Sequence, residues 1–139
     1  MTDLPLTVIA ATAGKIALAN LPANAYVTEY LPLQIAIPRA SLVICNGGSL
    51  TTYQALVSGV PILGICSNMD QLLNMNAIER LGTGLTLRAT RLRPDRLKAA
   101  VVTLLDRPGY RHAARRTGER FSQFDSGQRF RDFVGDVVG

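Results

Sequence analysis

The chain has 139 residues, of which 47% are hydrophobic and 18% charged, and its formal net charge is +5. This balance fits one globular domain and excludes a disordered or collagen-like chain. The two cysteines have neither zinc nor disulfide spacing. No apolar run approaches the roughly 18 residues that span a membrane, and no leader pattern precedes the first predicted strand. A cytoplasmic protein is therefore expected.

The predicted elements alternate between strand and helix along the chain. Short apolar or β-branched runs ending at turn residues predict strands over 6–11, 25–28, 42–45, 61–65 and 85–87. Helical spacing of apolar residues predicts helices over 33–39, 50–58, 71–81, 97–105, 110–124 and 128–138. The alternation indicates an α/β fold, a Rossmann-like parallel sheet with helices on both faces, formed by residues 1–139 as a single domain.

Ligands of such sheets bind outside the carboxyl ends of the strands, where loops 12–14, 46–49 and 66–71 are expected to converge. The most informative of these loops follows strand 42–45. Gly47 and Gly48 permit a tight turn there, and Ser49 and Thr51 place hydroxyls where the next helix begins. Unpaired N–H groups and the helix dipole both favour an anion at such a position. This segment therefore predicts a phosphate-bearing ligand, and a nucleotide in particular.

Positive charge is concentrated in the C-terminal part of the chain. Residues 1–87 hold three basic and four acidic residues, whereas residues 88–139 hold twelve basic and six acidic ones. Several arginines fall within one predicted helix: Arg107, Arg111, Arg115, Arg116 and Arg120. A solvated helix face is the simplest interpretation, and an anionic membrane surface or an acidic partner is the alternative. There is no aromatic stripe and no recognised nucleic-acid motif, so a nucleic-acid-binding module is the remaining option and rests on the C-terminal charge alone.

Beyond the glycine turn, a longer series of residues carries a family resemblance. The series is Asn46-Gly47-Gly48-Ser49-Leu50-Thr51-Thr52, Gly59-Val60-Pro61, Asp70-Gln71, Asn74 and Gly82-Thr83-Gly84. In order and spacing it resembles the donor-binding signature of GT-B glycosyltransferases over residues 26–87. The most similar group is the inverting nucleotide-sugar enzymes that include bacterial macrolide glycosyltransferases and UDP-glucuronosyltransferases. The resemblance implies the C-terminal, donor-binding domain of such an enzyme.

The resemblance implies a role for each residue of the turn. Gly47, Gly48, Ser49 and Thr51 would bind the donor diphosphate through N–H groups and hydroxyls. Asn46 stands at the position of a histidine in the family; its amide can donate a hydrogen bond but cannot become cationic. A simpler interpretation is that Asn46 only tolerates the strained turn.

Four further donor contacts are implied outside the turn. Gln54 replaces the family's glutamate, which binds the ribose diol, and Asp70 with Gln71 matches the pair that binds hydroxyls of the transferred sugar. Tyr30 matches an aromatic position near the base. The alternatives are that Gln54 lies on the helix surface, Asp70 is a helix N-cap and Tyr30 serves packing.

The implied reaction is transfer of a hexose from a nucleotide diphosphate sugar, UDP or dTDP, to an acceptor hydroxyl with inversion. The base belongs to an acceptor domain or subunit that is absent here, so the isolated chain is not expected to be active. No Asp-x-Asp pair indicates a metal, and no cofactor is expected. A non-catalytic or degenerate nucleotide-sugar-binding domain is the alternative; a nucleotide-sugar 2-epimerase is disfavoured by Asp70-Gln71.

The resemblance also implies that the chain starts at the second strand of the donor domain. In the usual order 3-2-1-4-5-6 the absent strand is a central one. We therefore expect strand 6–11 either to pair directly with strand 42–45 or to borrow a neighbour from another chain, which would form a homo-oligomer through an incomplete sheet.

Overall fold

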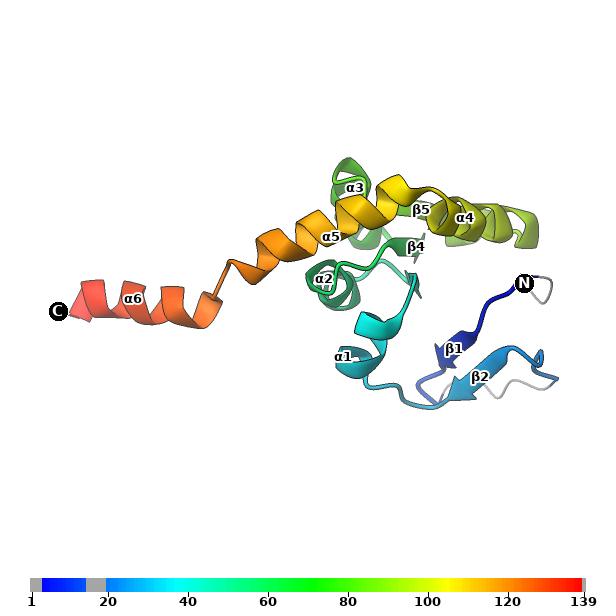
Figure 1. Cartoon of the computed structure of the whole chain (residues 1–139), viewed down its shortest axis with the longest axis horizontal. Helices are drawn as coiled ribbons and strands as arrows, with labels where there is room; N and C mark the ends of the chain where they lie inside the picture. The colour runs from blue at the N-terminus through cyan, green and yellow to red at the C-terminus, as the bar shows by residue number, and fades with distance from the viewer. Residues whose placement is uncertain (1–3, 15–19, 139) are drawn as a thin grey trace.

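The computed structural model describes residues 4–14 and 20–138 and contains each predicted element (Figure 1). The strands are β1 (Val8–Ala11), β2 (Ala25–Thr28), β3 (Val43–Cys45), β4 (Ile62–Cys66) and β5 (Gly84–Arg88). The helices are α1 (Leu33–Ala36), α2 (Ser49–Val57), α3 (Met69–Arg80), α4 (Pro94–Asp106), α5 (Pro108–Ser122) and α6 (Ser126–Val138). Two 3-10 helices, η1 (Ile37–Arg39) and η2 (Ala89–Arg91), follow α1 and β5.

Prolines account for the main differences from the predicted boundaries. Helix α5 begins earlier than predicted, at Pro108, and α4 begins at Pro94, ahead of its apolar 97–105 stretch, because a proline in the first turn has no N–H that the helix would use. The predicted helix over 33–39 divides into α1 and η1, with Pro38 in the first turn of η1. The proline cannot donate the backbone hydrogen bond that would continue α1.

All strand pairs in the described residues are parallel, but they form two sheets and not one. Strand β1 pairs with β2, with Val8 opposite Ala25, while β3, β4 and β5 form the second sheet in that order. Direct pairing of strand 6–11 with strand 42–45 was therefore a wrong expectation, because no ladder joins β1 to β3 in the part of the chain that is described. Leu4 and Leu6, before β1, pack on the Leu63 cluster, and α1 and η1 contact α2.

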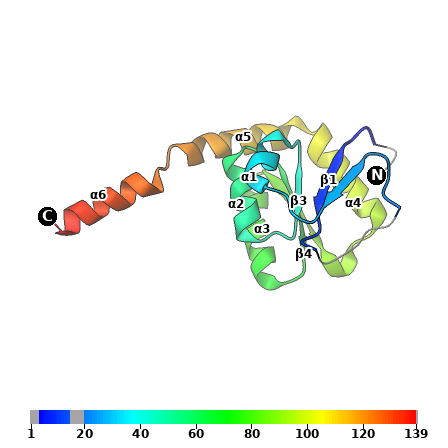
Figure 2. The ribbon, with the colours of Figure 1, turned by 90° about the horizontal axis from the view of Figure 1, so that it is seen from below.

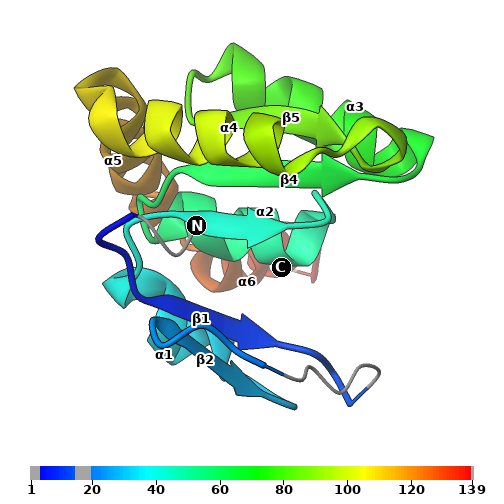
Figure 3. The ribbon, with the colours of Figure 1, turned by 90° about the vertical axis from the view of Figure 1, so that its right-hand side faces the viewer.

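Helices cover both faces of the three-stranded sheet (Figure 3). Ile62 and Leu63 are neighbours in β4 and are both fully buried, because successive side chains of a strand point to opposite faces. Ile62 belongs to a cluster that includes Leu56 of α2 and Met75 of α3. Leu63 belongs to a second cluster, with Val101 and Leu104 of α4 on the other face. This three-layer arrangement confirms the predicted fold class.

The two C-terminal helices differ in how they contact the rest of the molecule. Helix α5 packs against α2 and α4, and at Gly118 it approaches α2 so closely that a Cβ would lie 3.0 Å from the Leu56 carbonyl oxygen. Helix α6 has no buried residue and extends away from the sheets (Figures 1 and 2). Its Phe130 and Phe133 side chains are 68% and 65% exposed. No helix among the described residues has the length and apolar character to cross a membrane.

Candidate functional site

The candidate site lies at the carboxyl ends of β3 and β4, where the chain enters α2 and α3. Both strands are parallel, so their ends meet at one edge of the sheet, and the 46–49 and 66–71 loops follow them. The third predicted loop, 12–14, bonds elsewhere: the Thr12 and Ala13 amides donate to the carbonyls of Thr28 and Glu29. The 46–49 and 66–71 loops thus lie together at one edge of the three-stranded sheet.

Gly47 is required by both its backbone conformation and its surroundings. Its φ of +83° lies in the left-handed region, which an L-residue with a Cβ adopts only with strain. A Cβ at this position would also lie 2.8 Å from Cys66 Sγ and 2.8 Å from Met75 Cγ, two side chains that are almost fully buried. The loop can therefore approach β4 and α3 this closely only because residue 47 is glycine.

The N-terminus of α2 carries unsatisfied backbone donors. Its N-cap is Gly48, no side chain caps it, and the first helical hydrogen bond runs from the Thr52 amide to the Gly48 carbonyl. The amides of Ser49, Leu50 and Thr51 precede that bond and have no intrahelical acceptor. Three N–H groups at the positive end of a helix can hold an anion.

Asn46 contributes to the loop itself. Its Oδ1 accepts a hydrogen bond of 2.9 Å from the Gly48 amide, which fixes the turn immediately before α2. The Gly48 N–H is therefore already satisfied, contrary to the expectation that it is free for a ligand. Within residues 4–14 and 20–138 the Asn46 amide nitrogen has no acceptor, so it keeps its donor capacity.

Asn74 of α3 hydrogen-bonds to the glycine turn and was not among the predicted site residues. Its Nδ2 donates to the Gly47 carbonyl oxygen at 2.7 Å and to Thr52 Oγ1 at 2.8 Å. Thr52 is 1% exposed, and its hydroxyl in turn donates to the Gly48 carbonyl at 3.0 Å. A sequence signal existed, because Asn74 lies one helical turn after Gln71 and hence on the same side of α3. Asn74 and Thr52 together keep the glycine turn in one conformation.

The residue that caps the N-terminus of α3 differs from the one considered in the sequence analysis. The N-cap is Asn68, whose Oδ1 accepts from the Gln71 amide at 2.9 Å, so interpreting Asp70 as the cap was wrong. Asp70 instead lies exposed in the first turn. The Gln71 side chain is engaged locally, since its Oε1 accepts from the Ser67 amide at 2.8 Å and from the Ser67 hydroxyl at 3.1 Å. Only its amide nitrogen is left to donate to a ligand.

The remaining two predicted residues lie in contrasting environments. Gln54 is half-buried, and its Oε1 is sealed from solvent without a hydrogen-bond partner among the residues that the structure describes. It is therefore not a simple helix-surface residue, because an unpaired buried acceptor is unfavourable unless something supplies a donor. Tyr30 is 80% exposed just after β2, and no recorded side-chain contact connects it to the glycine turn.

Both cysteines border the site as free thiols. Burial raises the pKa of the Cys45 thiol, while a hydrogen bond from the Gly47 amide to its sulfur, at 3.4 Å, acts in the opposite direction. Burial is also the main cause that raises the pKa of Cys66, which is 2% exposed. Both thiols thus remain neutral near pH 7, as expected of small buried hydrophobes.

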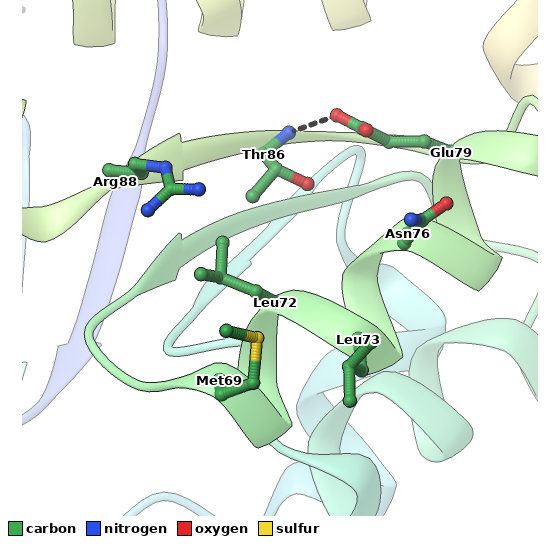
Figure 4. Close-up of a pocket in the computed structure, with 7 residues that line it drawn as sticks. All are labelled: Met69, Leu72, Leu73, Asn76, Glu79, Thr86 and Arg88. Atoms are coloured by element: carbon green, nitrogen blue, oxygen red, sulfur yellow. Dashed lines mark hydrogen bonds between the residues drawn. The ribbon is translucent and has the colours of Figure 1, made fainter.

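A separate cavity of about 330 Å³ lies between α3 and β5 (Figure 4). Its lining residues are Met69, Leu72, Leu73, Asn76, Glu79, Thr86 and Arg88. Within it, Glu79 Oε1 accepts from the Thr86 amide at 2.7 Å, and Thr86 Oγ1 is buried without a partner. None of the predicted donor-binding residues lines this cavity, so it is distinct from the candidate site at the glycine turn.

Comparison with known proteins places this geometry in a family. Residues 3–123 match the family described as "Erythromycin biosynthesis protein CIII-like, C-terminal domain". A PGL/p-HBAD biosynthesis glycosyltransferase of Mycobacterium tuberculosis is 54% identical over 121 residues, covering 87% of this chain and 28% of the relative. A PGL/p-HBAD biosynthesis rhamnosyltransferase of Mycobacterium bovis is 51% identical over 123 residues, covering 88% and 27%. The chain thus spans little more than a quarter of the length of these curated relatives.

Solved structures give the same result for the fold. A spinosyn forosaminyltransferase superposes with a TM-score of 0.90 at 23% identity, covering 99% of this chain and 36% of that one. A spinosyn rhamnosyltransferase complexed with thymidine diphosphate superposes with a TM-score of 0.79 at 27% identity, covering 88% and 34%. The chain belongs to the erythromycin biosynthesis protein CIII-like C-terminal domain family, and its fold is that of the C-terminal domain of a GT-B glycosyltransferase.

Proposed function

We propose that this domain, formed by residues 1–139, binds the nucleotide diphosphate sugar that donates the sugar in a glycosyl transfer. The diphosphate would lie against the N-terminus of α2, within reach of the Ser49, Leu50 and Thr51 amides and of the Ser49 and Thr51 hydroxyls. The single observation that carries the proposal is the set of unsatisfied helix donors beside a glycine turn that is already fixed in place. Asp70 and Gln71, at the start of α3, would contact the sugar, and Tyr30 the base.

The proposed reaction is displacement at the anomeric carbon with inversion. A base from an acceptor-binding domain or subunit would take the proton of the acceptor hydroxyl as the new bond forms. The departing diphosphate gains negative charge, and the α2 amides are oriented to stabilise that charge. Because this chain would supply only the leaving-group half of the site, it is expected to bind the donor and not to turn it over alone.

The names of relatives suggest the class of donor. One relative is a rhamnosyltransferase, and a structural neighbour was solved with thymidine diphosphate. A thymidine diphosphate sugar carrying a deoxyhexose is therefore the donor we propose first, ahead of a UDP sugar.

Calorimetric titration of the full chain with dTDP, UDP and GDP tests the proposal. We expect dTDP to bind, with Asn46→Asp weakening binding at least about tenfold, or 1.4 kcal/mol. The aspartate retains the oxygen that accepts from the Gly48 amide but adds a charge that repels a diphosphate. Asn76→Asp, at an exposed position of α3, is the matched control and should leave binding unchanged. Absence of dTDP binding at millimolar concentration, or equal effects of the two variants, would contradict the proposal.

The second candidate function is a nucleotide-sugar binder without catalytic use. Asn46 and Gln54 favour it, because both lack the charge of the residues that the family has at these positions, and Gln54 Oε1 is sealed inside the domain. The double variant Asn46→His/Gln54→Glu should tighten dTDP binding if these positions contact the donor. The control is the double variant Asn76→His/Gln34→Glu, in which both positions are exposed. Weaker binding in the first pair would show that Asn46 serves the loop and not the ligand.

A further inference from the structure

A further cavity lies at the end of the three-stranded sheet opposite to the glycine turn. It has a volume of about 440 Å³ and lies between the C-terminal end of α3 and the first turns of α5. Helix α3 starts after the carboxyl end of β4 and returns to the amino end of β5, and its 12 residues span about 18 Å. Figure 3 shows α5 at the end of the sheet from which β4 starts. This cavity is therefore separate from the candidate donor site.

Three arginines line this cavity: Arg80 at the end of α3, Arg107 between α4 and α5, and Arg116 on α5. All three are exposed, and none of their guanidinium groups forms an ion pair or a hydrogen bond in the part of the chain that the structure describes. Glu79 is the acidic residue of the lining, and its Oε1 accepts from the Thr86 amide at 2.7 Å on the β5 side (Figure 4). Three arginines against one glutamate leave the lining with a net charge of +2.

Small residues keep the cavity open between α3 and α5. Gly109, Ala113 and Arg116 are spaced by four and then three residues, so they share one face of α5. Ala113 is buried, and a Cβ at Gly82 would lie 3.8 Å from the Ala113 Cβ. The two helices thus approach each other through side chains that are too short to fill the space, and Arg116 lies beside this contact.

The start of α5 adds a backbone donor to the lining. The Gly109 N–H precedes the first hydrogen bond of α5, which runs from the Tyr110 amide to the Arg107 carbonyl at 3.3 Å, and it has no acceptor within the helix. Apart from the neighbours of Gly109 in the chain, no described atom lies within 4 Å of a Cβ built there, so a ligand can approach this backbone. The positive end of the helix dipole favours an anion at the same place as the arginines.

We infer that this cavity binds the phosphate group of a phosphate-bearing molecule through Arg80, Arg107 and Arg116. A guanidinium group can donate two parallel hydrogen bonds to phosphate oxygens, and it stays charged at every physiological pH. Three such groups from three places in the chain suit one compact, multiply charged group better than the spaced carboxylates of an acidic protein segment. The volume lies within the range of about 300–1,000 Å³ that small-molecule sites have, so there is room beside the phosphate for the group that carries it.

The test is an NMR titration of the full chain with pyrophosphate, in which amide chemical shifts report each site by itself. Sodium chloride at about 150 mM screens weak attraction between exposed charges. The Gly109 and Tyr110 amides should shift and saturate with a Kd of about 1 mM or below. The Ser49 and Leu50 amides report the α2 N-terminus separately, so loss of binding at one site does not hide binding at the other. Gly109 and Tyr110 shifts that do not saturate by about 10 mM would overturn the inference.

A matched pair of double variants separates this site from general attraction to a basic surface. Arg107→Gln/Arg116→Gln removes two lining arginines and should raise the Kd at Gly109 at least about tenfold. Arg96→Gln/Arg111→Gln removes the same charge from exposed positions of α4 and α5 outside the lining and should change the Kd less than about twofold. Equal effects of the two double variants would overturn the inference in favour of general electrostatic attraction.

Two further probes distinguish the sources of the phosphate group. Cosedimentation with phosphatidylcholine vesicles, with and without phosphatidic acid, tests a lipid headgroup. Pyrophosphate binding without vesicle binding assigns the site to a soluble phosphate compound. Vesicle binding that requires phosphatidic acid and is lost in Arg107→Gln/Arg116→Gln assigns it to a headgroup, and either result supports the inference. A hexaglutamate peptide that shifts Gly109 where neither phosphate probe binds would overturn it in favour of an acidic protein partner.

Discussion

Replacement of Gly47 by alanine should be among the more damaging single-methyl additions in this domain, and its effect can be divided into two parts. The first is backbone strain, because φ is +83°, and an L-residue in the left-handed region costs about 1–2 kcal/mol. The second is overpacking against Cys66 Sγ and Met75 Cγ, each 2.8 Å from the added Cβ, which costs about 1–3 kcal/mol. The expected loss of unfolding free energy is therefore about 2–5 kcal/mol.

Two other glycines isolate these contributions. Gly14 has a similar φ of +69°, and no atom of the described residues lies within 4 Å of an added Cβ, so Gly14→Ala should show the strain alone, about 1–2 kcal/mol. Gly109, in the first turn of α5, has neither positive φ nor a neighbour within 4 Å, and Gly109→Ala should stabilise by about 0.4–1 kcal/mol. The expected order of stability is Gly109→Ala, wild type, Gly14→Ala and then Gly47→Ala.

Urea unfolding followed by circular dichroism gives the unfolding free energy of all four proteins. Constant m-values are the check that only this free energy has changed. Gly47→Ala should also lose dTDP binding where folding persists, because the turn would move away from α3. If Gly47→Ala proves no less stable than Gly14→Ala, the close packing of the turn against Cys66 and Met75 is refuted. The glycine would then be needed for its backbone conformation alone.

Three further predictions follow from individual contacts. Asn74→Ala removes the hydrogen bonds to the Gly47 carbonyl and Thr52 Oγ1 and should lower the unfolding free energy by about 1–3 kcal/mol in urea; an unchanged midpoint would contradict the role given to Asn74. Thr86→Val removes a buried hydroxyl that has no partner and should raise the thermal midpoint, whereas a lower midpoint would mean that the hydroxyl is satisfied in solution. Burial raises the pKa of Cys66 in the folded state above its unfolded value near 9. The neutral thiol therefore stabilises the fold fully below about pH 9, and this contribution is lost as the pH rises further. Between about pH 8 and 10, the unfolding free energy of Cys66→Ala should fall less than that of the wild type.

The features that could be predicted from the sequence are those determined by local chemistry. The glycine turn between β3 and α2 depends on residues adjacent in the chain, and the structure has it where the sequence indicated. The same applies to Gly59 and Gly82, which end α2 and α3 at positive φ. In each case the deciding interaction spans a few residues, so the pattern of residue types was sufficient.

The features that were missed depend on tertiary contacts or on competition between similar side chains. Asn68 and Asp70 can both cap a helix, and the choice between them is made by where β4 ends, at Cys66. Asn74 contacts Gly47 across 27 positions of sequence, so its spacing from Gln71 indicated the side of α3 on which it lies but not its partner. The division of the strands into two sheets is likewise a matter of tertiary pairing, which the local pattern of residues does not determine.

The way the loop is held has a consequence for how a ligand would be recognised. Asn46 Oδ1 accepts from the Gly48 amide and Asn74 Nδ2 donates to the Gly47 carbonyl, which fixes the turn without a ligand. A preformed turn does not have to be ordered on binding, so less of the interaction energy is lost than with a flexible loop. The anion would then be held chiefly by backbone amides of α2, which mutation of surrounding side chains does not remove. Substitutions at Asn74 should therefore weaken binding through the conformation of the turn, by an amount that scales with their effect on the unfolding free energy. A charge introduced at Asn46 should instead weaken binding and leave the unfolding free energy unchanged.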